Sequence, residues 1–284
     1  MKQANSEKAE ILLESYPQLA SCQGKTYLVK YGGSAMESID VRRSVCDELA
    51  GLVGLGIRIV VVHGGGKEIS RLLERLAIES HFIQGQRVTS VAAMSAIEMA
   101  LSGAINKDLA SRITHCGADA IGLSGRDARI FVGRTIVGPA GEDLGLAGEV
   151  VSCNTRPIYA LLNSDFLPVV SPVAETVDGR ALNINADFAA AALAGALNVS
   201  DCIYLTDVDG VKDGERVAAQ LTETAVNAMI ADGRIMGGMI PKVQCAVRAL
   251  QAGCAQATIC NAAKPMIVSQ ALTRTLQSGT VIVS

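Results

Sequence analysis

The chain has 284 residues, of which 49% are hydrophobic and 19% are charged, and its formal net charge is -3. This length can bury one large α/β core or two lobes that share a sheet, and mild acidity without a basic block argues against a nucleic-acid partner. No apolar run reaches the length of a membrane span, and the eight cysteines form no Cys-x-x-Cys pair, so we expect a cytoplasmic protein with reduced thiols and no membrane partner.

The first predicted elements are a helix and a strand. An amphipathic helix is expected over residues 6–20, with Ser6 as its cap. After a break at residues 23–25, an apolar strand over 26–30 ends in Lys30 and is followed by Gly32-Gly33-Ser34. Asp40 is predicted to cap the helix that comes next.

A second strand, over residues 57–62, also runs into glycines, at Gly64-Gly65-Gly66, and then into an amphipathic helix. Consecutive glycines let backbone N–H groups approach a ligand closely, and a helix N-terminus behind them favours an anion. Either glycine cluster by itself is also consistent with a tight turn. Together with Lys30, the two clusters predict a phosphate-binding floor, although neither matches the P-loop or the dinucleotide fingerprint.

The remaining elements alternate between helix and strand. Helices are expected over 91–115, 156–163, 188–197, 223–231 and 241–252, strands over 119–123, 166–170, 202–206, 257–260 and 280–283, and hairpins within 130–151. Uniformly apolar strands between helices indicate the α/β class, as a three-layer αβα sandwich around an open, mostly parallel central sheet. Its glycine loops are expected along one edge.

Several polar motifs interrupt this apolar pattern. Asn183-Ile184-Asn185-Ala186-Asp187 opens an alanine-rich helix, where one side chain can be a cap and the others favour ligand binding. Asp207-Val208-Asp209-Gly210 follows a strand and is interpreted first as an Asx turn, with a metal site or an acid/base pair as alternatives. Lys242 lies early in a helix, where it opposes the helix dipole and favours a neighbouring anion. Arg87 is either a surface arginine or a carboxylate clamp, and His63 is interpreted as a packing or backbone-bonding residue.

In this order, the segments resemble the amino acid kinase family over nearly the whole chain. The matching stretches are residues 29–36, 62–66, 87–89, 106–108, 183–187, 205–211 and 237–242. Within the family, the resemblance is to the branch that phosphorylates N-acetylglutamate. It implies transfer of the γ-phosphoryl group of ATP, with Mg²⁺ carried by the nucleotide and no metal site in the protein, to the side-chain carboxylate of N-acetyl-L-glutamate, the second step of arginine biosynthesis.

The resemblance also implies residue roles. Lys30 and Lys242 would stabilise the transferring phosphoryl group from opposite lobes, with Asp187 holding both lysines. The acceptor would be bound by Gly64, Gly65, Arg87, Asn183 and Asn185, with Arg87 on its α-carboxylate. The nucleotide would be lined by Gly32, Gly33, Asp207, Val208, Asp209, Gly210, Val211, Lys212, Arg234, Ile235 and Met236.

Three regions and a homo-oligomer follow from the same resemblance. Residues 1–22 would form an oligomerisation helix, residues 23–180 an acceptor-binding N-lobe, and residues 181–284 an ATP-binding C-lobe. The N-terminal helix resembles that of the hexameric, arginine-regulated branch, which implies homodimers that join as a trimer of dimers. A nitrogen-signalling regulator is a further candidate partner.

The chain also departs from the family pattern. Lys67 replaces the usual proline after the glycines, and Gln244 replaces a frequent glutamate. Met266, Ala271 and Gln277 stand where the arginine-sensitive branch has a histidine, a glutamate and the first glycine of a G-x-G-T turn, which predicts weak or absent inhibition by arginine. Lys67 and the altered C-terminus motivate one alternative, a kinase for a related N-capped acidic amino acid such as N-acetyl-aminoadipate. A second alternative is a non-catalytic regulatory subunit with the same fold, against which the retained Lys30, Lys242 and Asp187 argue.

Overall fold

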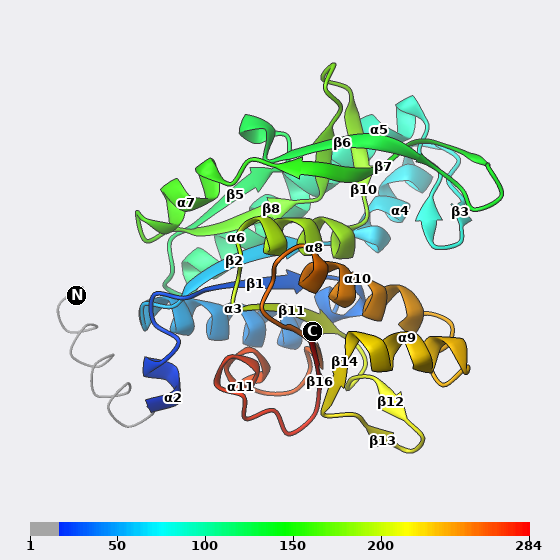
Figure 1. The fold of residues 1–284 in the computed structure, drawn as a ribbon. Helices are drawn as coiled ribbons and strands as arrows, with labels where there is room; N and C mark the ends of the chain where they lie inside the picture. Colours follow the sequence, from blue (N-terminus) through cyan, green and yellow to red (C-terminus); the bar gives the residue numbers. More distant parts are fainter. Residues whose placement is uncertain (1–16) are drawn as a thin grey trace.

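The computed structural model describes residues 17–284, so most of the helix predicted over residues 6–20 lies outside the described residues. Its centre is an eight-stranded sheet in the order β14-β16-β15-β11-β1-β2-β8-β5 (Figure 1). Every neighbouring pair is parallel except β15 with β16, which confirms the predicted fold class. In chain order these strands are β1 (Thr26–Tyr31), β2 (Arg58–His63), β5 (Ala120–Ser124), β8 (Leu167–Ser171), β11 (Asp201–Thr206), β14 (Gln220–Thr222), β15 (Ala257–Asn261) and β16 (Thr280–Val283).

Helices cover both faces of the sheet. Tyr27 and Val29 of β1 face one core with α3 (Ile39–Gly54), α6 (Asn106–His115) and α11 (Ile267–Thr273). Leu28 faces the other core with α7 (Arg156–Leu162), α8 (Ala186–Ala196) and α10 (Met239–Gln251). The other helical segments are α2 (Pro17–Ala20), η1 (Gly33–Met36), α4 (Gly66–Arg75), α5 (Val91–Glu98), η2 (Met99–Ile105), η3 (Asp127–Arg129) and α9 (Glu223–Ala231). None of the helices within residues 17–284 is long and apolar enough to cross a membrane.

Some local predictions need correction. Helix α3 is capped by Ser38, whose Oγ accepts the Val41 N–H at 3.3 Å, whereas Asp40 lies in the first turn and contributes a favourable charge to the helix dipole. The predicted helix over residues 91–115 is present, but η2 in its middle is a π-helical segment.

Several short strands were not predicted. The expected hairpin of β6 (Phe131–Val137) and β7 (Asp143–Cys153) is closed into a small barrel by β9 (Val173–Glu175) and β10 (Ala181–Ile184). Two further hairpins pair β3 (Phe82–Ile83) with β4 (Gln86–Arg87) and β12 (Lys212–Asp213) with β13 (Arg216–Val217). Two to four residues give too few alternations for a strand pattern to be recognised.

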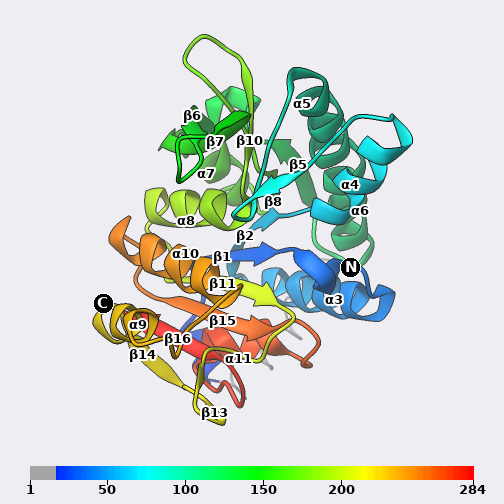
Figure 2. The ribbon, with the colours of Figure 1, turned by 90° about the vertical axis from the view of Figure 1, so that its right-hand side faces the viewer.

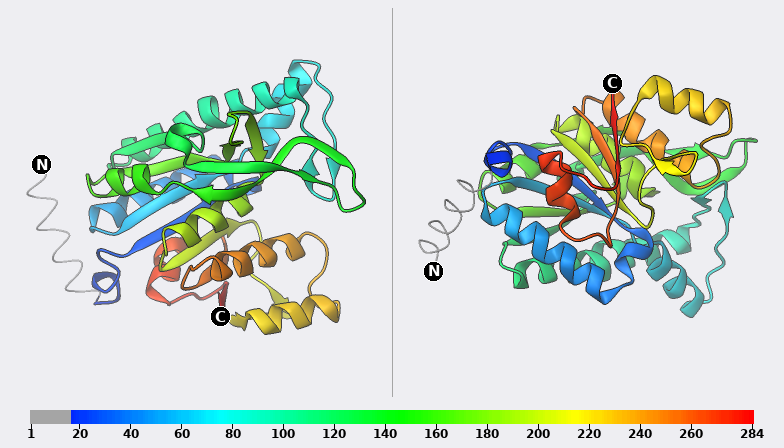
Figure 3. Two further views of the ribbon diagram at one scale, coloured as in Figure 1. Left: turned by 45° about the horizontal axis from the view of Figure 1, so that its top comes forward. Right: turned by 90° about the horizontal axis from the view of Figure 1, so that it is seen from below.

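The central sheet has two halves that meet between β1 and β11. Strands from before residue 172 form one half, and strands from after residue 200 form the other, with Lys30 in register with Tyr204 across the junction. Figures 2 and 3 show α9 and the strands after β11 gathered on one side of β1, and α4, α5 and the β6–β7 hairpin on the other. The assignment of residues 23–180 to the acceptor and 181–284 to ATP stays a prediction.

Candidate active site

The two glycine loops meet at the ends of β1 and β2. These strands are parallel, with Lys30 opposite Val62, so both loops leave the same edge of the sheet. The Gly64 N–H donates to the Tyr31 carbonyl at 2.8 Å. A Cβ at Gly32 would lie 3.0 Å from Lys30 Nζ and 3.1 Å from the Gly64 nitrogen. Glycine is therefore needed here to bring both loops and the ammonium group together.

A cavity of about 210 Å³ opens above this floor. Its lining includes all five predicted acceptor-binding residues, together with Lys30 and Asp187: Lys30, Gly64, Gly65, Arg87, Asn183, Asn185 and Asp187. They come from β1, the loop after β2, the β3–β4 hairpin, β10 and the start of α8. The fold thus brings together residues up to 157 positions apart, while their part in binding stays a prediction.

Lys30 and Asp187 form an ion pair at the cavity, with Lys30 Nζ 2.8 Å from Asp187 Oδ1. Lys30 is only 8% exposed. Asn185 accepts the Asp187 N–H through its Oδ1 at 2.8 Å and is the N-cap of α8, so helix capping is its demonstrated role. The cap and the ion pair together fix the Lys30 ammonium beside the glycine floor.

The Arg87 guanidinium is buried and is held by neutral groups. Nη1 donates to Ser80 Oγ at 2.6 Å, and Nη2 donates to Ser70 Oγ at 2.8 Å and to the Gly66 carbonyl at 3.0 Å. The group also lies over the Phe82 ring, 4.5 Å from its centroid. Burial lowers the pKa of Arg87, and no carboxylate within residues 17–284 pairs with it. A buried cation without a counterion favours an anionic ligand, which supports the carboxylate-clamp interpretation.

Ser70 and Ser80 were missed by the sequence analysis. Hydroxyl groups ten residues apart carry no spacing signal that relates them to Arg87. Asn183 is linked to the same region, because its Nδ2 donates to Thr89 Oγ1 at 3.1 Å and Thr89 Oγ1 donates to the Arg87 carbonyl at 2.8 Å. Its position on the cavity wall is therefore fixed by the backbone of Arg87.

His63 lies directly beneath the second glycine loop with no exposed surface. Its Nδ1 is 2.9 Å from the Gly64 carbonyl oxygen, and its Nε2 is 3.0 Å from Asn106 Nδ2. Burial lowers the pKa of His63 to about 4, so the ring is neutral at neutral pH. These contacts confirm the interpretation of His63 as a backbone-bonding residue.

Lys242 pairs with a different carboxylate from the one that the resemblance implies. Its Nζ lies 3.2 Å from Asp207 Oδ1, and no ion pair joins it to Asp187 in the described part of the chain. The first turn of α10 lies near the end of β11, and the carboxylate that follows this strand neutralises the lysine there. Among the described residues Asp187 thus pairs with Lys30, and its expected contact with Lys242 in the presence of ligands stays a prediction.

The predicted nucleotide segments lie side by side. Arg234 of the second segment has Nη1 3.1 Å from Oδ1 of Asp213, the residue that follows the first segment, and its Nη2 lies 2.7 Å from Oδ2 of Asp232 in its own turn. Gly210 has φ of 146°, and a Cβ there would lie 2.6 Å from Val217 Cγ1, so this turn requires glycine. Val211 and Ile235 are buried, whereas Met236 is exposed.

The carboxylate of Asp209 contacts two side chains that lie at and just after the end of β15. Its Oδ1 accepts from Asn261 Nδ2 at 2.8 Å, and its Oδ2 lies 3.7 Å from Lys264 Nζ. Over residues 17–284, no group of three or more His, Cys, Asp or Glu side chains is placed to hold a metal ion.

Lys67, the unusual residue after the glycines, points to a different partner. Its Nζ lies 2.5 Å from Glu37 Oε1, just beyond η1. The side chain is 61% exposed and does not line the cavity. Lys67 is therefore neutralised outside this cavity, which removes one reason to expect a different acceptor.

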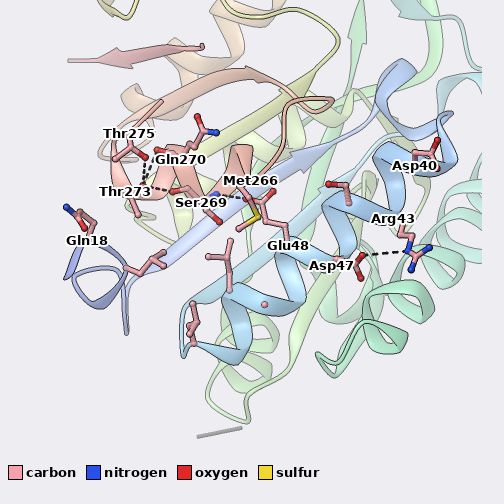
Figure 4. Close-up of a pocket in the computed structure, with 15 residues that line it drawn as sticks. Gln18, Asp40, Arg43, Asp47, Glu48, Met266, Ser269, Gln270, Thr273 and Thr275 are labelled. Atoms are coloured by element: carbon pink, nitrogen blue, oxygen red, sulfur yellow. Dashed lines mark hydrogen bonds and ion pairs between the residues drawn. The ribbon is translucent and has the colours of Figure 1, made fainter. Parts of the chain in front are cut away.

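A second cavity, of about 960 Å³, lies between α2, α3 and α11 (Figure 4). Glu48 of α3 points toward α11, where its Oε1 accepts the Ser269 N–H at 2.6 Å. Met266 lines this cavity, whereas Ala271 is buried in the core. Of the three altered C-terminal positions, Met266 thus lines this cavity, and Ala271 lies within α11, which contributes other residues to its wall.

Comparison with known proteins gives consistent matches. The amino acid kinase family matches residues 25–261. An acetylglutamate kinase from Alcanivorax borkumensis is 41% identical over 265 residues, which cover 88% of this chain and 89% of that protein. An N-acetylglutamate synthase structure from Neisseria gonorrhoeae matches with a TM-score of 0.81 and 21% identity over 99% of this chain, which spans 63% of that longer protein. A carbamate kinase from Giardia lamblia, bound to AMP-PNP, matches with a TM-score of 0.65 and 19% identity over 92% of this chain and 99% of that protein. At these identities, the two solved structures show only that their fold is similar to that of this chain.

Proposed function

The chain belongs to the amino acid kinase family, and from this premise we propose that it transfers the γ-phosphoryl group of ATP to the side-chain carboxylate of N-acetyl-L-glutamate. The 41% identity to an acetylglutamate kinase supports this acceptor. The observation that carries the proposal is the small cavity with two buried cations, Lys30 and Arg87, of which only Lys30 has a carboxylate partner among residues 17–284. An acceptor with two carboxylates can place one at Arg87 and the other beside Lys30.

The chemistry needs charge and position, and no proton transfer. A carboxylic acid with a pKa of about 4.3 is already ionised at neutral pH. One of its oxygens attacks the γ-phosphorus, the bond from that phosphorus to the β,γ-bridging oxygen breaks, and ADP leaves with the electron pair. The product is an acyl phosphate. The obstacle is the approach of two anions, which fixed cations and N–H donors reduce.

Lys30 is the cation already in place for this step. Its ammonium is fixed between Asp187 and the glycine floor. We propose that Lys242 joins it by exchanging Asp207 for the phosphoryl group, so that Asp187 then lies between both lysines. Such an exchange requires the long Lys242 side chain to turn away from Asp207, or α10 to move.

The nucleotide is proposed to lie along the segments 207–212 and 234–236, with its phosphates toward Gly32 and Gly33. Mg²⁺ would accompany ATP and be held mainly by the phosphate oxygens. We also propose a cytoplasmic homo-oligomer in which residues 1–22 join dimers into a hexamer, with a nitrogen-signalling protein as a candidate regulator. Gel filtration with light scattering would test the hexamer directly.

Trapping the acyl phosphate with hydroxylamine tests the function. We expect ATP-dependent hydroxamate formation with N-acetyl-L-glutamate, none with L-glutamate, and kcat/KM at least about tenfold lower with N-acetyl-L-aminoadipate, which is one methylene longer. Faster turnover of the aminoadipate would replace the proposed acceptor by the longer one. Absence of hydroxamate with every acceptor would support the regulatory-subunit alternative instead.

A further inference from the structure

His63 is a buried titratable residue that the proposed chemistry does not use. We infer that His63 is a positioning residue, which fixes the Gly64–Gly65 peptide so that the Gly65 N–H points into the acceptor cavity. The inference rests on the proposed function, since it concerns the same cavity. Its geometric basis is a short relay that runs from Asn106 through His63 to the Gly64 carbonyl.

The relay fixes a single tautomer of the imidazole. The Gly64 carbonyl oxygen can only accept, so Nδ1, at 2.9 Å, carries the proton and donates it. Nε2 is then the acceptor for the Asn106 amide at 3.0 Å. That amide is oriented in turn, because Asn106 Nδ2 also donates to the Val169 carbonyl at 2.9 Å, with the Leu123 carbonyl further away at 3.3 Å, and Asn106 Oδ1 accepts from Lys107 Nζ at 3.0 Å. Each donor and acceptor of the relay therefore supports the same orientation of the ring.

The orientation of the peptide follows from its planarity. In a trans peptide, the carbonyl of one residue and the N–H of the next point in opposite directions. The Gly64 carbonyl is turned inward to His63, which has no exposed surface. The Gly65 N–H is therefore turned away from His63, and both glycines line the cavity that contains Lys30.

The two glycines make such a restraint necessary. Glycine tolerates most backbone conformations, so a Gly-Gly peptide can flip at little cost unless another group holds it. A flipped peptide would present a carbonyl oxygen to the acceptor carboxylate, which is repulsive, whereas the present one offers a donor. Gly65 is also packed against Leu101 and Ile105, which leaves no room for a side chain at this position. His63 thus selects which end of the peptide dipole meets the anion.

The alternative is that His63 only fills space in the core, and two substitutions separate these roles. The amide nitrogen of asparagine is attached to Cγ, as Nδ1 is, so His63→Asn keeps a donor for the Gly64 carbonyl. In His63→Gln the amide lies one bond further out, at the place of Nε2, and this donor is lost. Glutamine is nevertheless closer to histidine in volume, so a packing role makes His63→Gln the milder change.

We expect the opposite order in steady-state kinetics. In His63→Asn, kcat/KM for N-acetyl-L-glutamate stays within about fivefold of the unmodified protein, and in His63→Gln it falls by about 10²-fold, the loss typical of a misplaced oxyanion donor. The KM for ATP stays within about twofold in both, since ATP is proposed to bind along other segments. Thermal unfolding of both variants checks that each is folded. Equal losses in the two variants, or a smaller loss in His63→Gln, would overturn the inference.

Nitrogen NMR of the imidazole gives a second readout that does not depend on turnover. The unmodified protein should show Nδ1 protonated and Nε2 unprotonated at neutral pH, and the reverse tautomer would contradict the inference. This readout also separates the two proposals. If the protein phosphorylates no N-acetyl-L-glutamate, the proposed function fails, while the tautomer still decides whether the relay to Gly64 exists.

Discussion

The proposed acceptor side and the proposed nucleotide side of the site hold their cations in different ways. Lys30 and Arg87 are 8% and 6% exposed and are fixed by groups from several elements. On the nucleotide side, the side chains of Lys242 and Arg234 are 27% and 46% exposed and pair with nearby carboxylates. Exposed ion pairs are weak and can exchange partners. The difference leads us to expect that the proposed acceptor side is organised in advance and that the proposed nucleotide side rearranges around its ligand.

The largest expected effect comes from a comparison of two lysines that lie beside the glycine loops, Lys30 and Lys67. We expect Lys30→Met to lower kcat by about 10³-fold or more, because a cation fixed at the developing charge is lost. Lys67→Met removes an exposed lysine that pairs with Glu37 outside the cavity, and should change kcat by less than about threefold. Steady-state kinetics with thermal unfolding as a folding control checks both. Retention of a tenth of the activity in Lys30→Met would contradict the assignment.

Arg87 tests whether the acceptor side recognises a second carboxylate. N-acetylated γ-aminobutyrate is the acceptor without its α-carboxylate, and we expect its kcat/KM to be about 10²-fold lower than that of N-acetyl-L-glutamate. Arg87→Leu should raise the KM for N-acetyl-L-glutamate by a similar factor and leave the KM for ATP unchanged. The variant should also lose the preference between the two acceptors. An undiminished preference would place the α-carboxylate elsewhere.

Gly210 tests the nucleotide side. A Cβ at Gly210, where φ is 146°, would meet Val217 and Thr280, so Gly210→Ala displaces the turn after β11. We expect the KM for ATP to rise about tenfold, with little change for the acceptor. Gly214→Ala is the matched control, because Gly214 also has positive φ, of 64°, but a Cβ there meets nothing. Equal effects of the two substitutions would show that backbone strain, and not the position of the turn, causes the loss.

Asp201 tests whether folding stability can change while the binding of ATP and of the acceptor stays the same. It is fully buried at the start of β11, where its Oδ2 accepts from Gln256 Nε2 and Thr258 Oγ1, both at 2.7 Å. Burial raises the pKa of Asp201 from 3.8 to about 7. Between these values the folded state binds more protons than the unfolded state, so this group's contribution to stability falls as pH rises from about 4 to about 7.

The substitution Asp201→Asn removes this titration. The free energy of unfolding of the variant, minus that of the unmodified protein, should be about 2 kcal/mol larger at pH 8 than at pH 5. Both KM values should stay unchanged. Urea unfolding at the two pH values measures the difference. The same stability difference at both would show that Asp201 is ionised throughout.

The smallest expected effect is that of arginine. No carboxylate is available at position 271, since it is a buried alanine, and Glu48 in the neighbouring cavity already accepts the Ser269 N–H. We expect millimolar arginine to lower the initial rate by less than about twofold, which corresponds to a weak coupling between the two cavities. Strong inhibition at low arginine concentrations would overturn this prediction.

The sequence was informative wherever the relevant pattern is local. Strands that end in glycine placed Lys30 and Gly64 correctly at one sheet edge, and the resemblance placed Arg87 and Asn183 on one cavity. What escaped prediction depends on contacts between distant segments. The pairing of Lys242 with Asp207 and the serines that hold Arg87 have no signature in spacing. The role of Asn185 as a cap was one of two local interpretations, and the structure shows the cap.

The central claim is that Lys30 and Lys242 together neutralise the phosphoryl group during transfer. The most direct test is a crystal structure with ADP, Mg²⁺, N-acetyl-L-glutamate and aluminium fluoride as a mimic of the transferring group. We predict that both ammonium groups contact the fluoride mimic, with Asp187 between them and Lys242 released from Asp207. A complex in which Lys242 stays on Asp207, and only Lys30 reaches the mimic, would contradict the account.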